Sequence, residues 1–369
     1  MPVTIIVEPN ASGHRFEAVA NVARLASRTG EVYLLTSVDA AQGDEFEAYL
    51  SDLQLKVDTV FDEAEPPTRA IVEALAAGYA DSDVGTVVLM DADQSLKRWW
   101  VTAPRRLRRM RSRPRIVFML TRYPAKLAIT DWFGWLLRSS KATLALLAMA
   151  SGSLHRVAGF AGRDDMSRGW LVKRTRDPAV CVAHSRDRVR LRHDLGLPSD
   201  RRLVGIFGGV SERKHPQLVH AAALAAGDDA DLLLAGSVAP EVAAWIDSLS
   251  AADRARLIVR DGFHPNELLD QLVASVDVVA TAMTNNGPSG IMGKALAAGV
   301  PVVSAGSLVR ARELAVTGNG AAAELTVSSF ADALRRVLDH PSDEPWQSSV
   351  PLPTGERFAA ALLGVDLPA

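Results

Sequence analysis

The chain has 369 residues, of which 48% are hydrophobic and 23% charged, with a formal net charge of −2. Domains commonly hold about 100 to 200 residues, so we expect two of them. The small net charge predicts no strong attraction to nucleic acid. A single cysteine, Cys181, excludes an internal disulfide. The opening MPVTIIVEPN lacks the basic stretch and apolar run of a secretory signal, and apolar runs such as 142–150 are too short to span a bilayer. These features favour a cytoplasmic protein.

Strand-like and helix-like patterns alternate along the first half. The run VTIIVEP (3–9) is followed by a Gly-containing turn and an amphipathic stretch from Phe16 to Arg28. Further runs with the character of fully buried strands lie at 31–37, 86–93, 115–121 and 142–148. This alternation predicts a doubly wound parallel sheet in a domain of residues 1–187.

The second half repeats the pattern. A strand at 203–207 precedes a loop and a helix, Pro216–Ala226, in which Pro at the first turn is well placed. Further strands are expected at 231–237, 255–262, 276–281 and 300–306. The stretch 188–200 is predicted to be a polar helix, capped by Gly196 and ended by Pro198, that links the two halves and opens a second domain at 188–342. A tail at 343–369 ends with a helix at Glu356–Leu363. The predicted fold class is α/β, with two Rossmann-like parallel sheets.

Two glycine-containing loops follow strands of the second domain, where open α/β sheets bind ligands. The first carries Gly208 and Gly209, which let backbone approach a ligand, and the cations Arg213 and Lys214, which can neutralise a diphosphate. The second ends in Ser289-Gly290 at the start of a short helix, whose free N–H groups suit a phosphate. Each loop alone could equally be an ordinary βα connection.

Four segments carry a family resemblance: RLRHDLGLPSDRRLVGIFGGVSERKHPQLVHAAALA, DLLLAGS, DGFHPNELLDQLVASVDVVATA and PSGIMGKALAAGVPVVSAGS. They resemble the C-terminal half of the retaining GT-B glycosyltransferases (glycosyl transferases group 1, family 4-like) that are related to sucrose and glycogen synthases. The resemblance covers about residues 188–325 and extends to the N-terminal half only in the order of elements. It implies a GT-B fold of two domains facing across a cleft, a nucleotide diphosphate sugar as donor substrate, and no cofactor or metal.

The resemblance also assigns donor-site residues. Lys214 takes the place of the lysine that grips the diphosphate, whereas Gly209 stands where the family has an arginine, for which Arg213 is the nearest substitute. Asn286 and Lys294 occupy the positions of two glutamates that contact the donor sugar and the ribose. Asn286 can still hydrogen-bond a sugar hydroxyl, while Lys294 would seek a phosphate or a carboxylate. The stretch DGFHPNELL adds the donor-site candidates Gly262, Phe263 and Glu267.

Acceptor and catalytic candidates lie in the first half. His14 follows Gly13 in the first βα loop, where a histidine can act as acid or base or belong to the loop structure. Thr121-Arg122 stands where the family has a His-Asp pair. The acids Asp91 and Asp93 resemble the metal motif of the other large glycosyltransferase fold, but GT-B enzymes use cationic side chains instead.

A basic window separates Asp93 from Asp131. It contains no acid and eleven Lys and Arg residues, at positions 97, 98, 105, 106, 108, 109, 111, 113, 115, 122 and 126, with Trp99 and Trp100 at its edge. The window is either a solvated helix face or a surface for an anionic, lipid-linked or phosphorylated acceptor, which would give a peripheral membrane contact.

Three functions remain open at this stage. The first is transfer of a sugar from a nucleotide sugar to an unidentified acceptor, with retention. The second is a glycoside phosphorylase or nucleotide-sugar epimerase on the same fold, in which Lys294 would bind phosphate. The third is a catalytically silent, sugar-nucleotide-binding partner subunit, suggested by the missing carboxylates.

Overall fold

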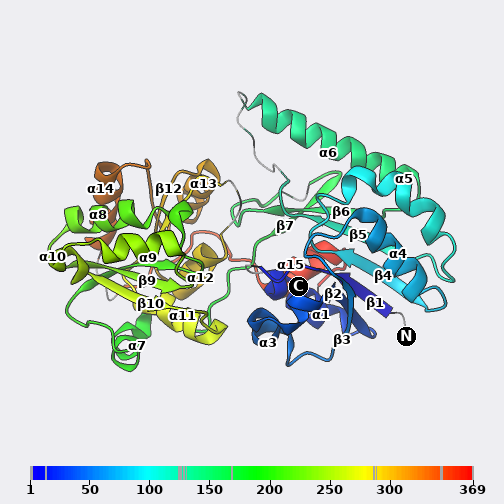
Figure 1. The fold of residues 1–369 in the computed structure, drawn as a ribbon. Coiled ribbons are helices and arrows are strands. Elements are labelled where there is room, and N and C mark those ends of the chain that lie inside the picture. Colours follow the sequence, from blue (N-terminus) through cyan, green and yellow to red (C-terminus); the bar gives the residue numbers. More distant parts are fainter. Residues whose placement is uncertain are drawn as a thin grey trace. The chain divides into compact units, whose positions relative to one another are not determined.

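A computed structural model describes residues 3–12, 15–123, 127, 129, 131–167, 169–285, 287, 289–340 and 344–367. The chain forms two compact units, each built on one sheet (Figure 1). The first unit comprises Met1–Ala161, Asp165–Asp177 and Thr354–Ala369, and the second comprises Gly162–Asp164 and Pro178–Pro353. The predicted boundary at residue 187 lies ten residues beyond the point, Asp177, at which the first unit ends in mid-chain.

The first unit holds a seven-stranded sheet in the order β3-β2-β1-β4-β5-β6-β7, with every pair parallel. Its strands are β1 (Val3–Val7), β2 (Val32–Ser37), β3 (Lys56–Phe61), β4 (Val84–Leu89), β5 (Arg115–Leu120), β6 (Arg156–Ala161) and β7 (Val172–Arg176). The register places Ile5 of β1 opposite Tyr33 of β2 and Val87 of β4. Strand order reverses between β1 and β4, so the switch point lies there.

Helices cover both faces of this sheet. They are α1 (Arg15–Ala26), α2 (Val38–Gln42), α3 (Asp44–Leu50), α4 (Thr68–Gly78), α5 (Leu96–Leu107), α6 (Trp132–Ala150) and α15 (Gly355–Leu363). One core lies between the sheet and α4, α5 and the C-terminal half of α6, and the other between the sheet and α1, α3 and α15. The last helix therefore completes the first unit, where the ring of Phe358 meets the ring of Phe160 edge-on.

The second unit holds a six-stranded parallel sheet in the order β10-β9-β8-β11-β12-β13. Its strands are β8 (Arg202–Phe207), β9 (Ala230–Gly236), β10 (Leu257–Asp261), β11 (Val278–Ala282), β12 (Val302–Ala305) and β13 (Gly320–Ala323). Its helices are η1 (Ser185–Asp187), α7 (Arg188–Asp194), η2 (Glu212–Lys214), α8 (Pro216–Ala226), α9 (Pro240–Asp247), α10 (Ala251–Arg254), α11 (Asn266–Ser275), α12 (Gly290–Ala298), α13 (Leu308–Thr317) and α14 (Val327–Leu338). The predicted α/β class and two Rossmann-like parallel sheets are confirmed.

Two predictions about local structure are wrong. Residues 142–148, predicted as a buried strand, lie inside helix α6. The run consists of Ala, Leu and one β-branched residue, Thr143, and a short apolar run of good helix formers cannot be told from a buried strand by periodicity alone. Residues 188–194 do form a helix, α7, as predicted, but this helix belongs to the second unit rather than linking the two, because Arg188 and Arg192 both bind Asp277 beside the sheet.

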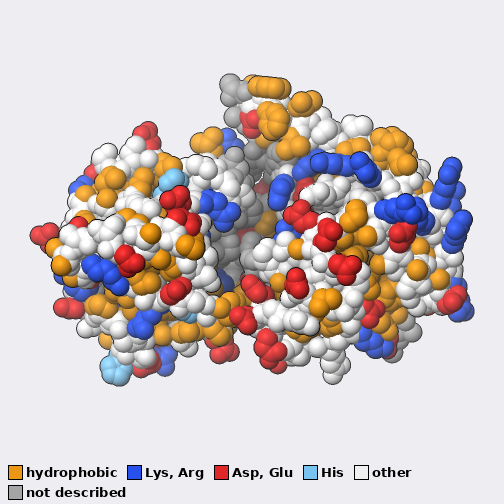
Figure 2. Space-filling view, in the orientation of Figure 1, with side chains coloured by type: hydrophobic (Ala, Val, Ile, Leu, Met, Phe, Trp, Pro, Cys, Tyr) orange, Lys and Arg blue, Asp and Glu red, His pale blue; other side chains and the backbone are white. Residues whose placement is uncertain are grey.

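The tryptophan pair at the edge of the basic window divides between core and surface. Trp99 is fully buried, its ring lies edge-on to Phe118, and its indole N–H donates to the Ser153 carbonyl at 2.8 Å. Trp100 remains exposed. Trp99 therefore stabilises the fold and cannot serve as a surface contact. Exposed apolar side chains instead gather on α6 (Figure 2).

Candidate functional site

The two glycine loops of the second unit flank its switch point. Strand order reverses between β8 and β11, so the loops that follow these two strands emerge side by side at the carboxyl edge of the sheet. These are the loops predicted from sequence, beginning at Gly208 and at Met283. The fold thus places both candidates where open α/β sheets bind ligands.

Lys214 folds back over the first loop. Its ammonium donates a hydrogen bond to the carbonyl of Phe207, the last residue of β8, and lies close to Gly208. This return depends on the following turn, in which His215 adopts φ 47° before Pro216 begins α8. Burial, reinforced by neighbouring Arg213, lowers the pKa of Lys214 to about 8. In the described residues no carboxylate neutralises it, so two of its three N–H donors remain for an anion.

Glycine is required in this loop by backbone geometry. Gly208 has φ +76°, and a side chain at Gly236 would lie 2.3 Å from the carbonyl oxygen of Gly208. Gly209 has open space around its Cα, and Arg213 is exposed. The loop thus offers a ligand the exposed backbone at Gly209 and two cations, Arg213 and Lys214.

A buried arginine binds the backbone of the second loop. Arg310 of α13 donates to the carbonyls of Met283, Asn285 (3.0 Å) and Gly287 (3.3 Å), and it is fully buried. Burial lowers the pKa of Arg310 to about 10, which still leaves it charged at neutral pH. Asn286, the candidate sugar contact, lies outside the described residues.

The start of α12 is fixed by a second buried arginine. Arg163 donates to the carbonyl of Ser289 at 3.1 Å and pairs with Glu313 at 2.9 Å, and neither charged side chain reaches solvent. The Ser289 hydroxyl caps the helix by accepting from the N–H of Met292 at 3.3 Å. Gly290 follows at the N-terminus, where helix amides and the dipole favour an anion.

Lys294 is directed inward. Its ammonium donates to Asp270 at 2.6 Å and to Asn266 at 2.5 Å, and the residue is buried. The second oxygen of the Asp270 carboxylate accepts the backbone N–H of Val182 at 2.8 Å. Of the two partners expected for Lys294, a phosphate or a carboxylate, the structure supplies the carboxylate. As a donor contact, Lys294 remains only a prediction.

The remaining donor-site candidates lie at the end of β10. Gly262 has φ +116°, Phe263 is exposed, and Glu267 is exposed in the first turn of α11. β10 stands two strands from β8 on the same edge of the sheet. The three residues are therefore available at the carboxyl edge, on the side of the switch point away from α12.

The first unit gathers a charged cluster at its own switch point. Thr121 donates to Asp91 at 3.2 Å and to Asp93 at 3.0 Å, which joins the ends of β4 and β5. Asp91 pairs with Arg15 at 2.7 Å, and Asp93 accepts from Lys141. The candidate pair Thr121-Arg122 thus lies within this cluster. The candidate His14 lies outside the described residues.

Asp93 and Glu8 complete the cluster. Asp93 also accepts the backbone N–H of Arg122 at 3.0 Å, while the Arg122 side chain is exposed. Glu8, directly after β1, is almost fully buried and pairs with Arg15 at 3.2 Å. Burial raises the pKa of Glu8 to about 7, against the opposing effect of Arg15. The acids that resembled a metal motif therefore bind cationic side chains, and in the part of the chain that is described no cluster of His, Cys, Asp and Glu has the arrangement of a metal site.

Sequence reasoning missed the residues that hold both sites. Arg163 is 126 positions from Ser289, and Lys141 is 48 positions from Asp93, so no local spacing links them. The only available signal was that charged residues interrupt otherwise apolar segments, as Lys141 does in α6.

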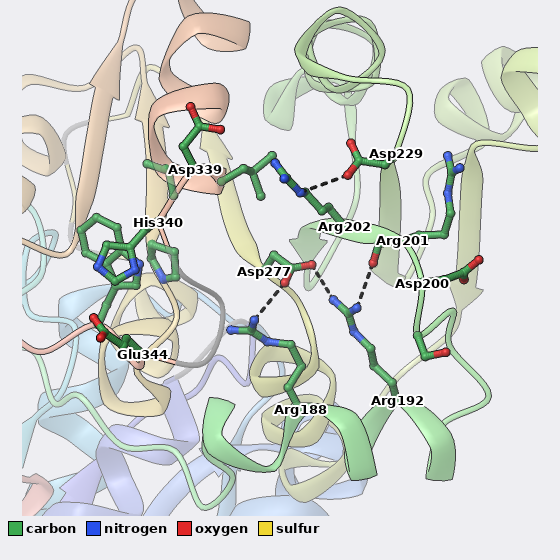
Figure 3. A pocket seen from close by; sticks show the side chains of 15 residues that line it. Arg188, Arg192, Asp200, Arg201, Arg202, Asp229, Asp277, Asp339, His340 and Glu344 are labelled. Atoms are coloured by element: carbon green, nitrogen blue, oxygen red, sulfur yellow. Dashed lines mark hydrogen bonds and ion pairs between the residues drawn. The ribbon is translucent and has the colours of Figure 1, made fainter.

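The second unit also has a cavity of about 490 Å³ at the opposite edge of its sheet (Figure 3). Arg202, Asp277 and Pro301, which line it, stand at or just before the starts of β8, β11 and β12. Arg188 and Arg192 point at Asp277 (2.9 and 2.5 Å), and Arg202 points at Asp229 (3.1 Å). These charges neutralise one another, so we assign the cavity a structural role in binding α7 to the sheet.

Comparison with known proteins identifies the fold. Residues 201–340 match the family model of glycosyl transferases group 1. HepE from Anabaena, solved with UDP and glucose, is 15% identical with a TM-score of 0.62, over 98% of this chain and 94% of that chain. Sucrose-phosphate synthase from Thermosynechococcus elongatus is also 15% identical, with a TM-score of 0.60 over 99% and 94%. WaaG, a glycosyltransferase involved in lipopolysaccharide biosynthesis, is 16% identical with a TM-score of 0.58 over 98% and 94%. No curated protein matches the sequence. The GT-B fold predicted from the resemblance is confirmed.

Proposed function

We propose that this chain, which has the GT-B fold and carries a glycosyl transferases group 1 domain, transfers a sugar from a nucleoside diphosphate to a hydroxyl group, with retention of configuration. One observation carries the proposal: among the described residues no carboxylate pairs with Lys214, which follows β8 at the switch point, and the neighbouring strand β11 leads into the N-terminus of α12. That combination suits a diphosphate, which needs cations and N–H donors together. HepE, which shares the fold, was solved with UDP, so a uridine diphosphate sugar is the first donor to test.

The donor roles follow from the geometry of the second unit. Lys214 and Arg213 contact the diphosphate, and the amides after Ser289 face the phosphate that leaves. The bond from the anomeric carbon to this phosphate breaks, its electron pair stays on the phosphate, and the acceptor oxygen forms the new bond. The acceptor proton passes to the leaving phosphate. Cations and helix amides stabilise the growing negative charge, which is the largest contribution that such a site can make.

The acceptor roles belong to the first unit. Thr121 and Arg122 lie at the carboxyl edge of its sheet, where the Thr121 hydroxyl binds Asp91 and Asp93 and the backbone N–H of Arg122 binds Asp93. Thr121 and the partly exposed Asp91 offer hydrogen bonds to acceptor hydroxyls, and the exposed guanidinium of Arg122 suits an anionic group on the acceptor.

A thermal-shift screen with UDP, GDP, ADP and dTDP tests the donor half of the proposal. A nucleotide that binds only the folded protein stabilises it by about 2.7 kcal/mol at a hundred times its dissociation constant. The nucleotide that shifts the melting temperature then selects the sugar nucleotides for turnover assays. If none of the four nucleotides shifts the transition, the donor assignment is wrong.

A silent binding subunit is the second candidate, and one observation favours it. Lys294 stands where related enzymes have a ribose-binding carboxylate, and it forms an internal ion pair with Asp270. Nucleotide binding without hydrolysis or transfer of any matching sugar nucleotide would select this candidate. A phosphorylase is less well supported, because it needs the Lys294 ammonium for phosphate.

A further inference from the structure

The N-terminal half of α6 presents large apolar side chains to solvent. Trp132, Phe133, Trp135 and Leu136 are 74%, 63%, 44% and 59% exposed, and we call these four residues the α6 apolar surface. In the described residues 131–141, only Gly134 is buried. A helix this apolar is normally covered by protein or lipid, whereas α6 contributes to the core of the unit through its C-terminal half, with Ala145 and Ala148.

The stretch of chain around the α6 apolar surface is strongly basic. Residues 94–161 include fourteen Lys and Arg and a single acid, Asp131. Helix α5, which packs against α6, contributes exposed Arg98 and Arg105, and Arg108 and Arg109 follow it. Figure 2 shows Lys and Arg side chains beside the hydrophobic side chains over α6. Within the described chain no carboxylate pairs with these four arginines.

We propose that the α6 apolar surface and the arginines of α5 dock the first unit on an anionic lipid bilayer. Tryptophan and phenylalanine side chains insert at the level of the headgroups, while Lys and Arg bind the anionic headgroups. Arg138, whose guanidinium lies 5.4 Å from the centre of the Trp135 ring, can reach the headgroups from the same turn of helix.

Charge decides between the bilayer and a second copy of this chain. In a two-fold dimer the same surface meets itself, which would oppose two strongly basic regions across one interface. An anionic bilayer neutralises them instead. Within the described residues no helix is long and apolar enough to cross a membrane, so the contact lies at the membrane surface.

Vesicle co-sedimentation of the full chain tests the proposal. We expect binding to vesicles of phosphatidylcholine and phosphatidylglycerol, weak binding to pure phosphatidylcholine, and loss of binding toward about 1 M salt, where the Debye length is about 3 Å. Replacing Trp132, Phe133, Trp135 and Leu136 together with Ser should weaken vesicle binding by about tenfold or more. Replacing Arg98, Arg105, Arg108 and Arg109 together with Gln should remove the preference for anionic vesicles.

A matched control substitutes exposed apolar residues of the second unit. Val189→Ser with Leu308→Ser changes side chains that are 80% and 70% exposed, and vesicle binding should not change. If the fourfold Ser variant folds poorly, the single substitution Trp132→Ala still tests the proposal. The proposal is overturned if the parent, Trp132→Ala and the fourfold Ser variant all bind vesicles equally. So would sedimentation velocity showing a parent dimer that the Ser variant dissociates, because the surface would then bind a second copy.

Discussion

At the proposed donor site after β8, nucleotide binding should depend on the charge of Lys214. With a pKa of about 8, its ammonium is about 90% charged at pH 7 and about 10% charged at pH 9. If a diphosphate binds only the charged form and holds the proton, its dissociation constant should rise up to about tenfold between these pH values, about 1.4 kcal/mol. Burial penalises the charged form of Lys214 and therefore depresses its pKa. Nucleotide binding should thus be stronger below pH 8, where the ammonium is charged, and weaker above pH 8.

Two substitutions isolate this effect. Lys214→Ala removes a charge-assisted hydrogen bond and should cost about 1.5 to 3 kcal/mol at pH 7, a roughly 13- to 160-fold loss of affinity. The variant should also lose the pH dependence. Lys214→Arg keeps a charge that does not titrate below pH 12, so its affinity should be nearly constant from pH 7 to 9.

Isothermal titration calorimetry with UDP at pH 7, 8 and 9 measures all three proteins. Any titration of the nucleotide is common to the parent and the variants, so it cancels when their slopes are compared. An unchanged slope in Lys214→Ala would show that another group is responsible. Unchanged affinity at pH 7 would remove Lys214 from the site altogether.

Three further predictions concern stability and metal dependence. Burial raises the pKa of Glu8 from 4.5 to about 7, so the folded state keeps a proton that the unfolded state releases, and stability should fall by up to about 3 kcal/mol as pH rises from 4.5 to 7. Glu8→Gln has no carboxyl proton to release, so its free energy of unfolding in urea, relative to that of the parent, should increase from pH 5 to pH 8. If the difference between variant and parent is the same at both pH values, the assignment is wrong. Gly293→Ala should destabilise the second unit by about 1 to 3 kcal/mol, because the added Cβ would lie 2.2 Å from the guanidinium of Arg163. Gly78→Ala, with no atom within 4 Å of its Cβ, is the matched control, and thermal melts in which both variants keep parental stability would refute the clash. Transferase activity should survive EDTA, since cationic side chains and helix amides stabilise the leaving phosphate, and a strict Mg²⁺ or Mn²⁺ requirement would reject this chemistry.

The second unit was the more predictable half, because its central strands are short, largely apolar and rich in Val and Leu. Its predicted strands appear as β8 to β12, and the predicted helix Pro216–Ala226 matches α8. The strand that escaped prediction there, β13 (GAAA), lies at an edge and has little β propensity. In the first unit β3 and β7 are also edge strands, with polar residues along their length.

The two loops at the donor site could be predicted because glycine turns after strands have a local signature. The residues that hold these loops in place could not be predicted. Arg310 and Arg163 act through contacts with backbone carbonyls remote in sequence, which no periodicity encodes. Lys294 shows another limit: its sequence position predicts a phosphate or a carboxylate as partner, but nothing local indicates that Asp270 of α11 supplies the carboxylate.

The placement of α15 determines the order in which the units can be completed during synthesis. Phe358, Leu362 and Leu363 fill one core of the first unit, yet they emerge after all of the second unit has been made. The half of the chain that is translated first therefore has an unfinished hydrophobic face until residues 355–363 leave the ribosome. Proteolysis just after Pro353 should accordingly destabilise the first unit while the second, whose main segment is the continuous stretch Pro178–Pro353, keeps its core.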